Sequence, residues 1–248
     1  MKLIRADWQA PDHIHALTTT RLDGYSHAPF ASLNLGTHVG DDPEAVAQNR
    51  QILLQALGLE KTPQWLNQVH GVQVVEASDD GQVREADGCW SEQPGVACVV
   101  MTADCLPVLF CDTRGRKVAA AHAGWRGLVD GVLEQTLSVF EKPGDVHVWL
   151  GPAIGPLAFE VGDEVRARFI ERQSAAESAF VVSPTDPSKW LADLYRLARL
   201  RLESRGVTQI SGGDYCTFSE SDYFFSYRRD GQTGRMASLI WIEPGALG

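Results

Sequence analysis

The sequence predicts a mixed α/β (α+β) fold in one domain that spans residues 1–248. Short apolar runs of strand length gather in the middle of the chain, at residues 96–101, 107–110, 118–121 and 146–150. These runs are nearly continuous rather than alternating, which is typical of strands buried on both faces. Helical and strand segments mix without a strict βαβ order, and no linker rich in Gly, Pro or Ser separates them. Together these observations favour a mixed sheet over a Rossmann fold or a barrel.

Three helices have clear signals. The first follows Asp42-Pro43-Glu44, in which Asp42 can cap the helix and Pro43 fits its first turn. Apolar residues at helical spacing continue to Leu57, and Gly58 is a suitable C-cap. A second helix is expected at about 128–140, and a third at about 191–204, before Gly206.

Weaker signals complete the expected fold. Residues 72–75, 207–210 and 238–242 have strand character. The irregular stretch 183–188, which contains two prolines, predicts a surface loop before the third helix.

Charge and cysteine content narrow the class of protein. The chain has 22 Lys and Arg against 32 Asp and Glu, a net charge of −10, so the basic stripe of a nucleic-acid binder is not expected. Five cysteines without paired spacing indicate free thiols and a cytoplasmic location. No apolar run reaches about 18 residues and the first residues lack a signal-peptide core, so neither membrane insertion nor export is expected. No feature indicates an obligate protein partner.

Reactive residues follow the ends of the apolar strands. The motifs of P-loop NTPases, dinucleotide-binding proteins, zincins and serine hydrolases are all missing from the sequence. Instead, Asp104 and Cys105 come just after the run 96–101, His122 follows the run 118–121, and His70 lies in a turn before 72–75. Strand ends are where open α/β folds place their sites, so these positions are candidates for function.

The thiol and two imidazoles of Cys105, His70 and His122 allow three interpretations. They can form a three-ligand zinc site with an open fourth position, as in catalytic zinc enzymes. Cys105 can instead be a nucleophile with a histidine base. The third interpretation is a buried thiol with two hydrogen-bonded turn histidines. Sequence spacing alone does not choose among them.

Several motifs together resemble the YfiH family of bacterial laccase-domain proteins, also called polyphenol oxidases or peptidoglycan editing factors. The matches run from about residue 18 to residue 242. The most specific of them are Asp104-Cys105-Leu106-Pro107-Val108 and His122-Ala123-Gly124-Trp125-Arg126-Gly127. Other matching stretches are Thr19-Thr20-Arg21, Ser32-Leu33-Asn34-Leu35-Gly36, His38-Val39-Gly40-Asp41-Asp42, Asn67-Gln68-Val69-His70-Gly71, Ala86-Asp87-Gly88, Phe225-Ser226-Tyr227-Arg228-Arg229 and Thr233-Gly234-Arg235.

The resemblance implies a fold and an activity. The implied fold is a single-domain mixed β-sandwich flanked by helices, similar to cysteine-hydrolase-like toxin domains. His70, Cys105 and His122 would hold a zinc ion. The implied activity is phosphorolysis of adenosine, inosine, guanosine and methylthioadenosine, with adenosine deaminase activity, and the implied partners are a small purine nucleoside and phosphate.

Two alternative activities accompany this resemblance. One is a cysteine-type hydrolase that edits peptidoglycan precursors, and the other is a copper-dependent polyphenol oxidase (laccase). Many relatives carry cysteines after the Gly-Pro-x-Ile-Gly turn, where this chain has Pro156-Leu157-Ala158. Those cysteines would be soft copper ligands, so their replacement disfavours copper.

Catalysis also requires proton transfer and substrate binding. Cys105, His122 and Asp104 are the expected catalytic residues, with Glu160 as the second candidate for moving protons. Trp125, Phe225 and Tyr227 are aromatic side chains that can stack on a purine. Arginines suit phosphate because their planar fork pairs with two oxygens. The expected substrate-binding residues, all in the matching motifs, are Arg21, Asn34, His38, Gln68, Arg126 and Arg228.

Overall fold

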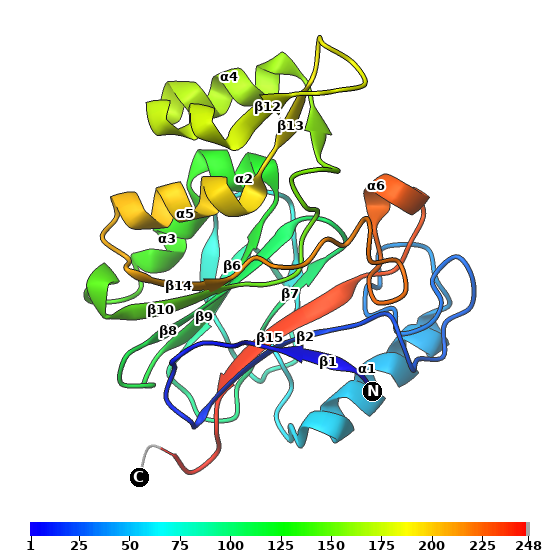
Figure 1. Ribbon diagram of the computed structural model, residues 1–248. Helices are drawn as coiled ribbons and strands as arrows, with labels where there is room; N and C mark the ends of the chain where they lie inside the picture. The colour runs from blue at the N-terminus through cyan, green and yellow to red at the C-terminus, as the bar shows by residue number, and fades with distance from the viewer. Residues whose placement is uncertain (247–248) are drawn as a thin grey trace.

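Two β-sheets pack face to face in the computed structural model, which describes residues 1–246 (Figure 1). Parallel and antiparallel pairs occur in the same sheet, since β10 (Val146–Leu150) runs parallel to β14 (Gln209–Gly212) and antiparallel to β8 (Leu106–Asp112). The six-stranded sheet has the order β14 (Gln209–Gly212), β10 (Val146–Leu150), β8 (Leu106–Asp112), β9 (Val118–Ala123), β6 (Gly88–Ser91), β4 (Val74–Glu76). The four-stranded sheet has the order β1 (Leu3–Arg5), β2 (Ile14–Thr19), β15 (Met236–Ile242), β7 (Cys98–Thr102). This arrangement confirms the mixed α/β sandwich.

The central strands are buried on both faces, as their continuous apolar runs predict. In β8, Val108 and Phe110 pack into the core under the helices, whereas Leu109 and Cys111 pack into the core between the two sheets. The alternation arises because successive side chains of a strand point to opposite faces. Each of these strands therefore belongs to two cores at once.

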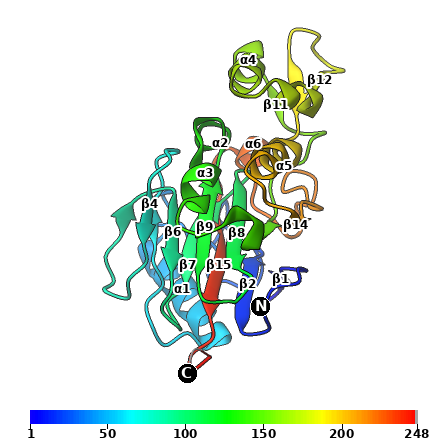
Figure 2. The same ribbon diagram turned by 90° about the vertical axis from the view of Figure 1, so that its left-hand side faces the viewer.

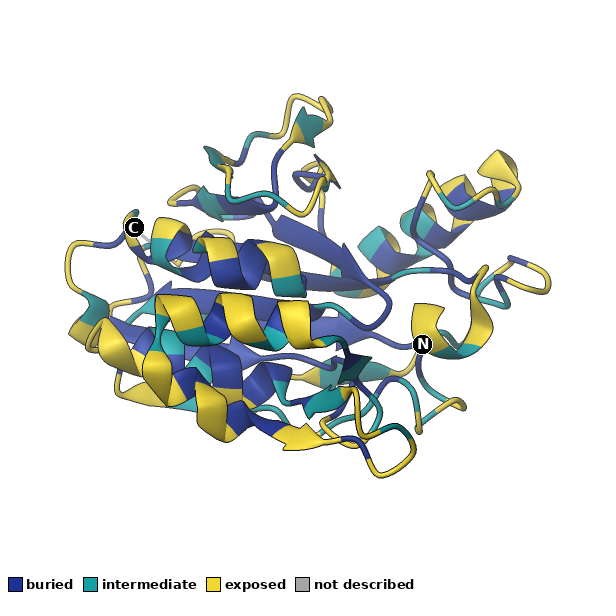
Figure 3. Ribbon diagram, turned by 90° about the horizontal axis from the view of Figure 1, so that it is seen from above, coloured by how far each residue is buried: buried dark blue, intermediate teal, exposed yellow. Residues whose placement is uncertain are grey.

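Helix α1 (Pro43–Leu57) covers the outer face of the four-stranded sheet and has the predicted bounds. Asp42 accepts a hydrogen bond from the Glu44 backbone N–H at its N-terminus, and Gly58 adopts a left-handed conformation (φ 64°) at its C-terminus. Its Leu53 side chain is fully buried against that sheet. Seen from above, the helices turn buried residues toward the sheets and exposed residues outward (Figure 3).

The other two helix predictions need correction. The expected helix at 128–140 is two helices, α2 (Trp125–Asp130) and α3 (Val132–Leu137), because Gly131 (φ 108°) breaks the helical backbone between them. The third helix, α5 (Leu194–Ser204), starts later than expected, since Asp193 caps it by accepting a hydrogen bond from the Arg196 backbone N–H. Residues 190–192 before this cap form the strand β13 (Trp190–Ala192).

A small three-stranded sheet stands above the sandwich (Figures 1 and 2). It consists of β11 (Glu160–Val161), β13 and β12 (Phe180–Val182), with α4 (Asp163–Arg172) and the 3₁₀-helix η2 (Ser174–Ala179) between them in sequence. The expected loop 183–188 joins β12 to β13, so a strand rather than a helix follows it directly.

Short elements complete the chain: β3 (Leu66–Asn67), β5 (Arg84–Glu85), the 3₁₀-helix η1 (Pro143–Asp145) and α6 (Tyr227–Asp230). The strands expected at 72–75 and 207–210 are found two residues later, as β4 and β14. Across residues 1–246, every helix is too short or too polar to cross a membrane.

Candidate metal centre

The structure brings His70, Cys105 and His122 together. Their ligand atoms, one ring nitrogen from each histidine and the Cys105 sulfur, all lie within 4.8 Å of one another. Cys105 Sγ is 3.8 Å from His70 Nε2, and the two imidazole rings meet edge to face with centroids 4.8 Å apart. The three side chains thus form a compact cluster with one thiol and two imidazoles.

Strand pairing accounts for this convergence. In the antiparallel pair β8–β9, Pro107 lies opposite His122, so Cys105, in the turn just before β8, faces the end of β9. Gly124, just after β9, leaves the space that the cluster needs. A Cβ atom on Gly124 would lie 2.8 Å from His70 Cδ2 and 3.0 Å from Cys105 Sγ, and these distances are shorter than normal contacts.

The carboxylate of Asp87 orients both histidines. Its Oδ1 accepts hydrogen bonds from His122 Nδ1 at 2.8 Å and from the His70 backbone N–H at 2.9 Å. Its Oδ2 accepts the backbone N–H groups of Val69 and Gly71, so the whole turn that carries His70 is fixed. Sequence reasoning missed this residue, which it noted only as part of the motif Ala86-Asp87-Gly88.

The cluster changes the acidity of its own members. Burial would raise the pKa of the Cys105 thiol, but the nearby His122 charge and hydrogen bonds from His122 and His70 lower it to about 6. Burial would lower the pKa of His122, but the Cys105 thiolate and the Asp87 carboxylate raise it to about 9. The metal-free chain therefore favours a thiolate beside an imidazolium at neutral pH.

The two carboxylates expected to move protons have different surroundings. Asp104 lies beside the cluster with a left-handed backbone (φ 94°). Its Oδ1 accepts a hydrogen bond from Thr217 Oγ1 and its Oδ2 from the Arg228 backbone N–H, both at 2.7 Å. Glu160 instead pairs with Lys189 at 3.0 Å and accepts a hydrogen bond from Ser183, on the small upper sheet. Only Asp104 of the two lines the cavity described next.

A cavity of about 430 Å³ opens onto the cluster. Of the residues expected to bind substrate, His38, Gln68 and Arg228 line it. The Gln68 side chain is held by the Met101 backbone, to which it donates at 2.8 Å and from which it accepts at 2.7 Å. The remaining lining residues besides the cluster and Asp104 are Met101, Thr102, Ala103, Ile154, Phe159, Tyr227 and Arg235.

Arg21, Asn34 and Arg126 lie outside this lining. Asn34 is fully buried, and it donates to Asp41 and accepts from the Arg235 backbone N–H. Arg126 is exposed, and its guanidinium lies 4.5 Å from the ring centroid of Trp125. Asn34 therefore supports the loop that contains Asp41, and Arg126 stacks on its neighbour in α2.

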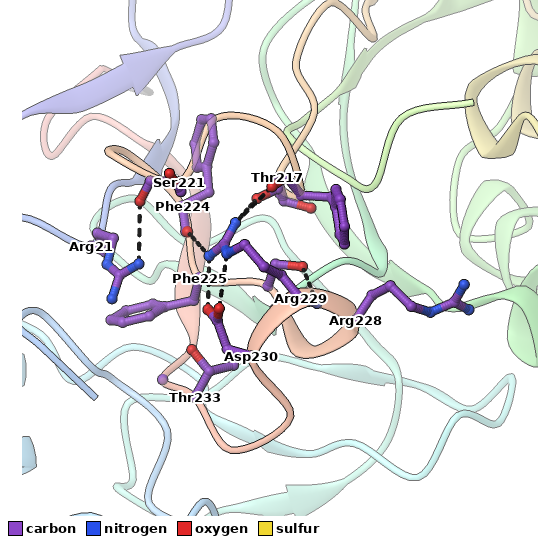
Figure 4. Close-up of polar contacts among 12 residues, drawn as sticks. Arg21, Thr217, Ser221, Phe224, Phe225, Arg228, Arg229, Asp230 and Thr233 are labelled. Carbon is purple, nitrogen blue, oxygen red and sulfur yellow. Dashed lines mark hydrogen bonds and ion pairs between the residues drawn. The ribbon is translucent and has the colours of Figure 1, made fainter. Parts of the chain in front are cut away.

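Arg21 belongs to a network that supports the segment before β15 (Figure 4). Its Nη1 donates to the Ser221 carbonyl, and its guanidinium stacks over the Phe225 ring at 4.8 Å. Arg229 donates to the carbonyls of Thr217, Phe218 and Phe224 and pairs with Asp230. In the same view the Arg228 side chain points away from this network.

The other cysteines differ in burial. Cys89, Cys98 and Cys111 are fully buried, as expected for packed thiols. Cys216 is half-buried, and its sulfur accepts a hydrogen bond from the Gly155 backbone N–H at 3.2 Å.

Comparison with known proteins gives a consistent result over nearly the whole chain. Residues 15–243 match the family described as multi-copper polyphenol oxidoreductase laccase. The purine nucleoside phosphorylase of Pseudomonas aeruginosa is 58% identical over 238 residues, covering 96% of this chain and 97% of that protein. The purine nucleoside phosphorylase YfiH of Escherichia coli is 52% identical over 243 residues, covering 97% and 99%.

Solved structures of similar proteins have the same fold. A crystal structure of a Neisseria meningitidis protein superposes with a TM-score of 0.93 at 51% identity, covering 98% of this chain and 100% of that one. The crystal structure of YlmD from Geobacillus stearothermophilus superposes with a TM-score of 0.84 at 34% identity, covering 94% and 93%.

Proposed function

The chain belongs to the multi-copper polyphenol oxidoreductase laccase family, and from that premise we propose that it is a zinc-containing purine nucleoside phosphorylase that also deaminates adenosine. The observation that carries the proposal is the convergence of His70, Cys105 and His122 at a cavity of about 430 Å³. A cavity of this size is in the range that binds small molecules. The similar proteins from Pseudomonas aeruginosa and Escherichia coli, both named purine nucleoside phosphorylases, support it.

The donor set suits zinc better than a copper array. One thiolate and two imidazoles make three protein ligands with one position open, and Asp87 supplies the second-sphere carboxylate on His122 that such sites use. Bound zinc supplies a water whose pKa falls to about 7. Within residues 1–246 this is the one group of its kind, whereas a multi-copper array needs further histidines. The Met101 sulfur, a weak copper ligand in other proteins, instead accepts a hydrogen bond from Arg50 at 3.8 Å.

The chain's own side chains then have distinct roles. Asp104, held beside Cys105 by Thr217 and the Arg228 backbone, accepts a proton at its carboxylate. Arg228 donates to the substrate, since only its Nη1 is engaged, at 2.9 Å from the Glu160 carbonyl. His38 and Gln68 complete the polar lining, and Tyr227 stacks on the base.

Phosphorolysis needs an anion and a good leaving group. A phosphate oxygen bonds to the ribose carbon while the carbon–nitrogen bond to the purine breaks, and the purine leaves with the electron pair and gains a proton. We place adenosine, inosine, guanosine and methylthioadenosine among the substrates. We place the reaction in the cytoplasm, where the five cysteines stay reduced.

Product analysis tests this function. Zinc-loaded protein is incubated with adenosine and phosphate, and adenine, inosine and ribose phosphate are measured, with His122→Ala as the control. The proposal requires inosine as the deamination product, and ribose phosphate equal in amount to adenine and hypoxanthine together, because inosine formed from adenosine is itself a substrate. If the zinc-loaded protein forms no more product than the His122→Ala control, the proposal is rejected.

A cysteine-type hydrolase that edits peptidoglycan precursors is the second candidate. The lowered pKa of Cys105, about 6, favours it, because a thiolate nucleophile beside His122 needs no metal. Exhaustive chelation separates the two candidates. Full activity without metal, together with covalent labelling of Cys105 by substrate, supports the hydrolase and excludes the zinc enzyme.

A further inference from the structure

Arg235 offers free hydrogen-bond donors to the cavity. It lies just before β15, and its Nη1 donates to the carbonyls of Thr233 at 2.9 Å and Gly234 at 3.0 Å. These bonds fix the guanidinium, and the polar contacts among residues 1–246 leave its Nε and Nη2 without a protein acceptor. Neither nitrogen is sealed from solvent, and Arg235 is part of the cavity lining. The guanidinium therefore presents two donors on one edge to whatever enters.

The charge of Arg235 is not balanced by a nearby carboxylate. No ion pair in the described part of the chain involves Arg235 or Arg50, although the protein has 32 acidic residues. Asp104 and Cys105 are near enough to influence Arg235 but lie beyond ion-pair distance. A half-buried guanidinium without a counter-ion has lost part of its hydration, and the two carbonyls bonded to Nη1 do not neutralise its charge.

Two more basic side chains, Arg50 and His38, lie near Arg235. Arg50 is held behind the cavity by the Leu35 carbonyl, at 3.0 and 2.8 Å, and stacks on Trp65 with its guanidinium carbon 3.8 Å from the ring centroid. His38 lines the cavity, and burial together with the charges of Arg235 and Arg50 lowers its pKa. His38, Arg50 and Arg235, here called the basic wall, place two guanidinium charges and one imidazole, kept neutral by them, beside the cluster of His70, Cys105 and His122.

We infer that the basic wall is the subsite for inorganic phosphate, in which Arg235 donates from Nε and Nη2 to two phosphate oxygens. A planar pair of donors matches two oxygens of a tetrahedral anion, and the unbalanced charge of the wall supplies the attraction. Arg228 is less suited, because its side chain is exposed and keeps more of its hydration than that of Arg235. This leaves Arg228 and Phe159 for the nucleoside. The inference rests on the proposed phosphorylase function.

Phosphate binding without nucleoside tests the subsite directly. Titration calorimetry of inorganic phosphate into the zinc-loaded protein is compared for wild type, Arg235→Gln and Arg114→Gln. Arg114 is an exposed arginine at the far end of β8, outside this cavity, so its replacement removes the same charge without touching the wall. We expect Arg235→Gln to weaken phosphate binding roughly 10- to 100-fold and Arg114→Gln to leave it unchanged. Equal binding by wild type and Arg235→Gln overturns the inference.

Steady-state kinetics separate this inference from the proposed function. We expect Arg235→Gln to raise the KM for phosphate while the KM for nucleoside stays within about 2-fold, and Arg235→Lys, which keeps the charge but not the fork, to lie between. Phosphorolysis with an unchanged phosphate KM in both variants rejects the subsite and leaves the function standing. Phosphate binding that needs Arg235, in a protein without phosphorolysis, keeps the subsite and rejects the function. Zinc content and melting temperature are measured for each variant as controls. If Arg235→Gln does not fold, the comparison is made with Arg235→Lys instead.

Discussion

Asp87 shows how one buried carboxylate can organise a site without touching its open position. It holds His122 through the ring and His70 through the backbone, so two ligands from different parts of the chain share one anchor. A carboxylate on the second ring nitrogen sets the tautomer, which leaves Nε2 of His122 free to bind a metal. The geometry of the ligands therefore depends on a residue that is not itself a ligand.

Replacing Asp87 with Asn should weaken zinc binding more than it weakens the fold. The amide has nearly the same shape, but its NH₂ group must face a backbone N–H that the carboxylate now accepts. We expect zinc affinity, measured by competition with a chelating dye, to fall about 10- to 100-fold. Asp80→Asn, at an exposed ion pair with Arg84, is the control and should leave the affinity unchanged. Equal affinity in the two variants would contradict the role of Asp87.

The acidity of Cys105 predicts a pH profile for the metal-free protein. Because its folded pKa is about 6, below that of an ordinary thiol, the thiolate predominates above pH 6 and is lost as the pH falls through that value. Alkylation of Cys105 by iodoacetamide, followed by peptide mass spectrometry, should rise with a midpoint near pH 6, and zinc should suppress it. A midpoint near 8.5 would show that His122 and His70 do not stabilise the thiolate.

The sequence was sufficient to single out His70, Cys105 and His122, which the structure brings together, but not to predict their surroundings. Cys105 and His122 follow apolar strands, and strand ends converge in a sheet. Asp87 acts through a hydrogen bond to His122, which is 35 residues away in sequence, so only the folded chain reveals its role. Membership in a motif did not separate Arg228, which lines the cavity, from Arg21, which supports a loop.

At the scale of elements, the sequence predicts a helix correctly where the residues at its two ends also fix those ends. Helix α1 carries its own caps, Asp42 and Gly58, and its bounds are as expected. The start of α5 instead depends on β13, because pairing with β11 and β12 draws residues 190–192 out of the helical pattern. Tertiary pairing of this kind is not encoded in apolar periodicity.

The helix break at Gly131 is a position where a small side chain should lower the stability of the fold. Its backbone has φ 108°, and the break between α2 and α3 depends on it. We expect Gly131→Ala to lower the free energy of unfolding by about 1–2 kcal/mol, because a side chain is strained in this conformation. Urea denaturation measures the free energy of unfolding of both proteins. The control is Gly144→Ala, whose added Cβ would be in ordinary contact, 3.7 Å from the Gly206 carbonyl. Equal losses in both variants would argue against strain at Gly131.

At the scale of the whole molecule, the cluster of His70, Cys105 and His122 links three distant segments. His70 comes from the loop after β3, Cys105 from the turn before β8 and His122 from the end of β9. An ion bound by all three stabilises the folded chain and not the unfolded one.

Removing the metal should therefore lower the melting temperature of the entire protein. The expected stabilisation is about 4 kcal/mol when free zinc exceeds its Kd by about 1,000-fold. Differential scanning calorimetry with and without a chelator measures the difference, and His122→Ala should abolish it. A melting temperature of the wild type that does not respond to chelation would contradict metal binding by this cluster.

Because β8 and β9 are buried on both faces, the segments that carry the three candidate ligands are expected to open at different rates. Amide hydrogens in such strands exchange with solvent only when the cores on both sides open together, which is close to global unfolding. Cys105 and His122 are attached to these slowly exchanging strands, whereas His70 sits in an exposed turn with a left-handed backbone (φ 61°). We expect metal to be released first from His70, because its turn is held by hydrogen bonds to the Asp87 carboxylate, and these can break while β8 and β9 stay folded.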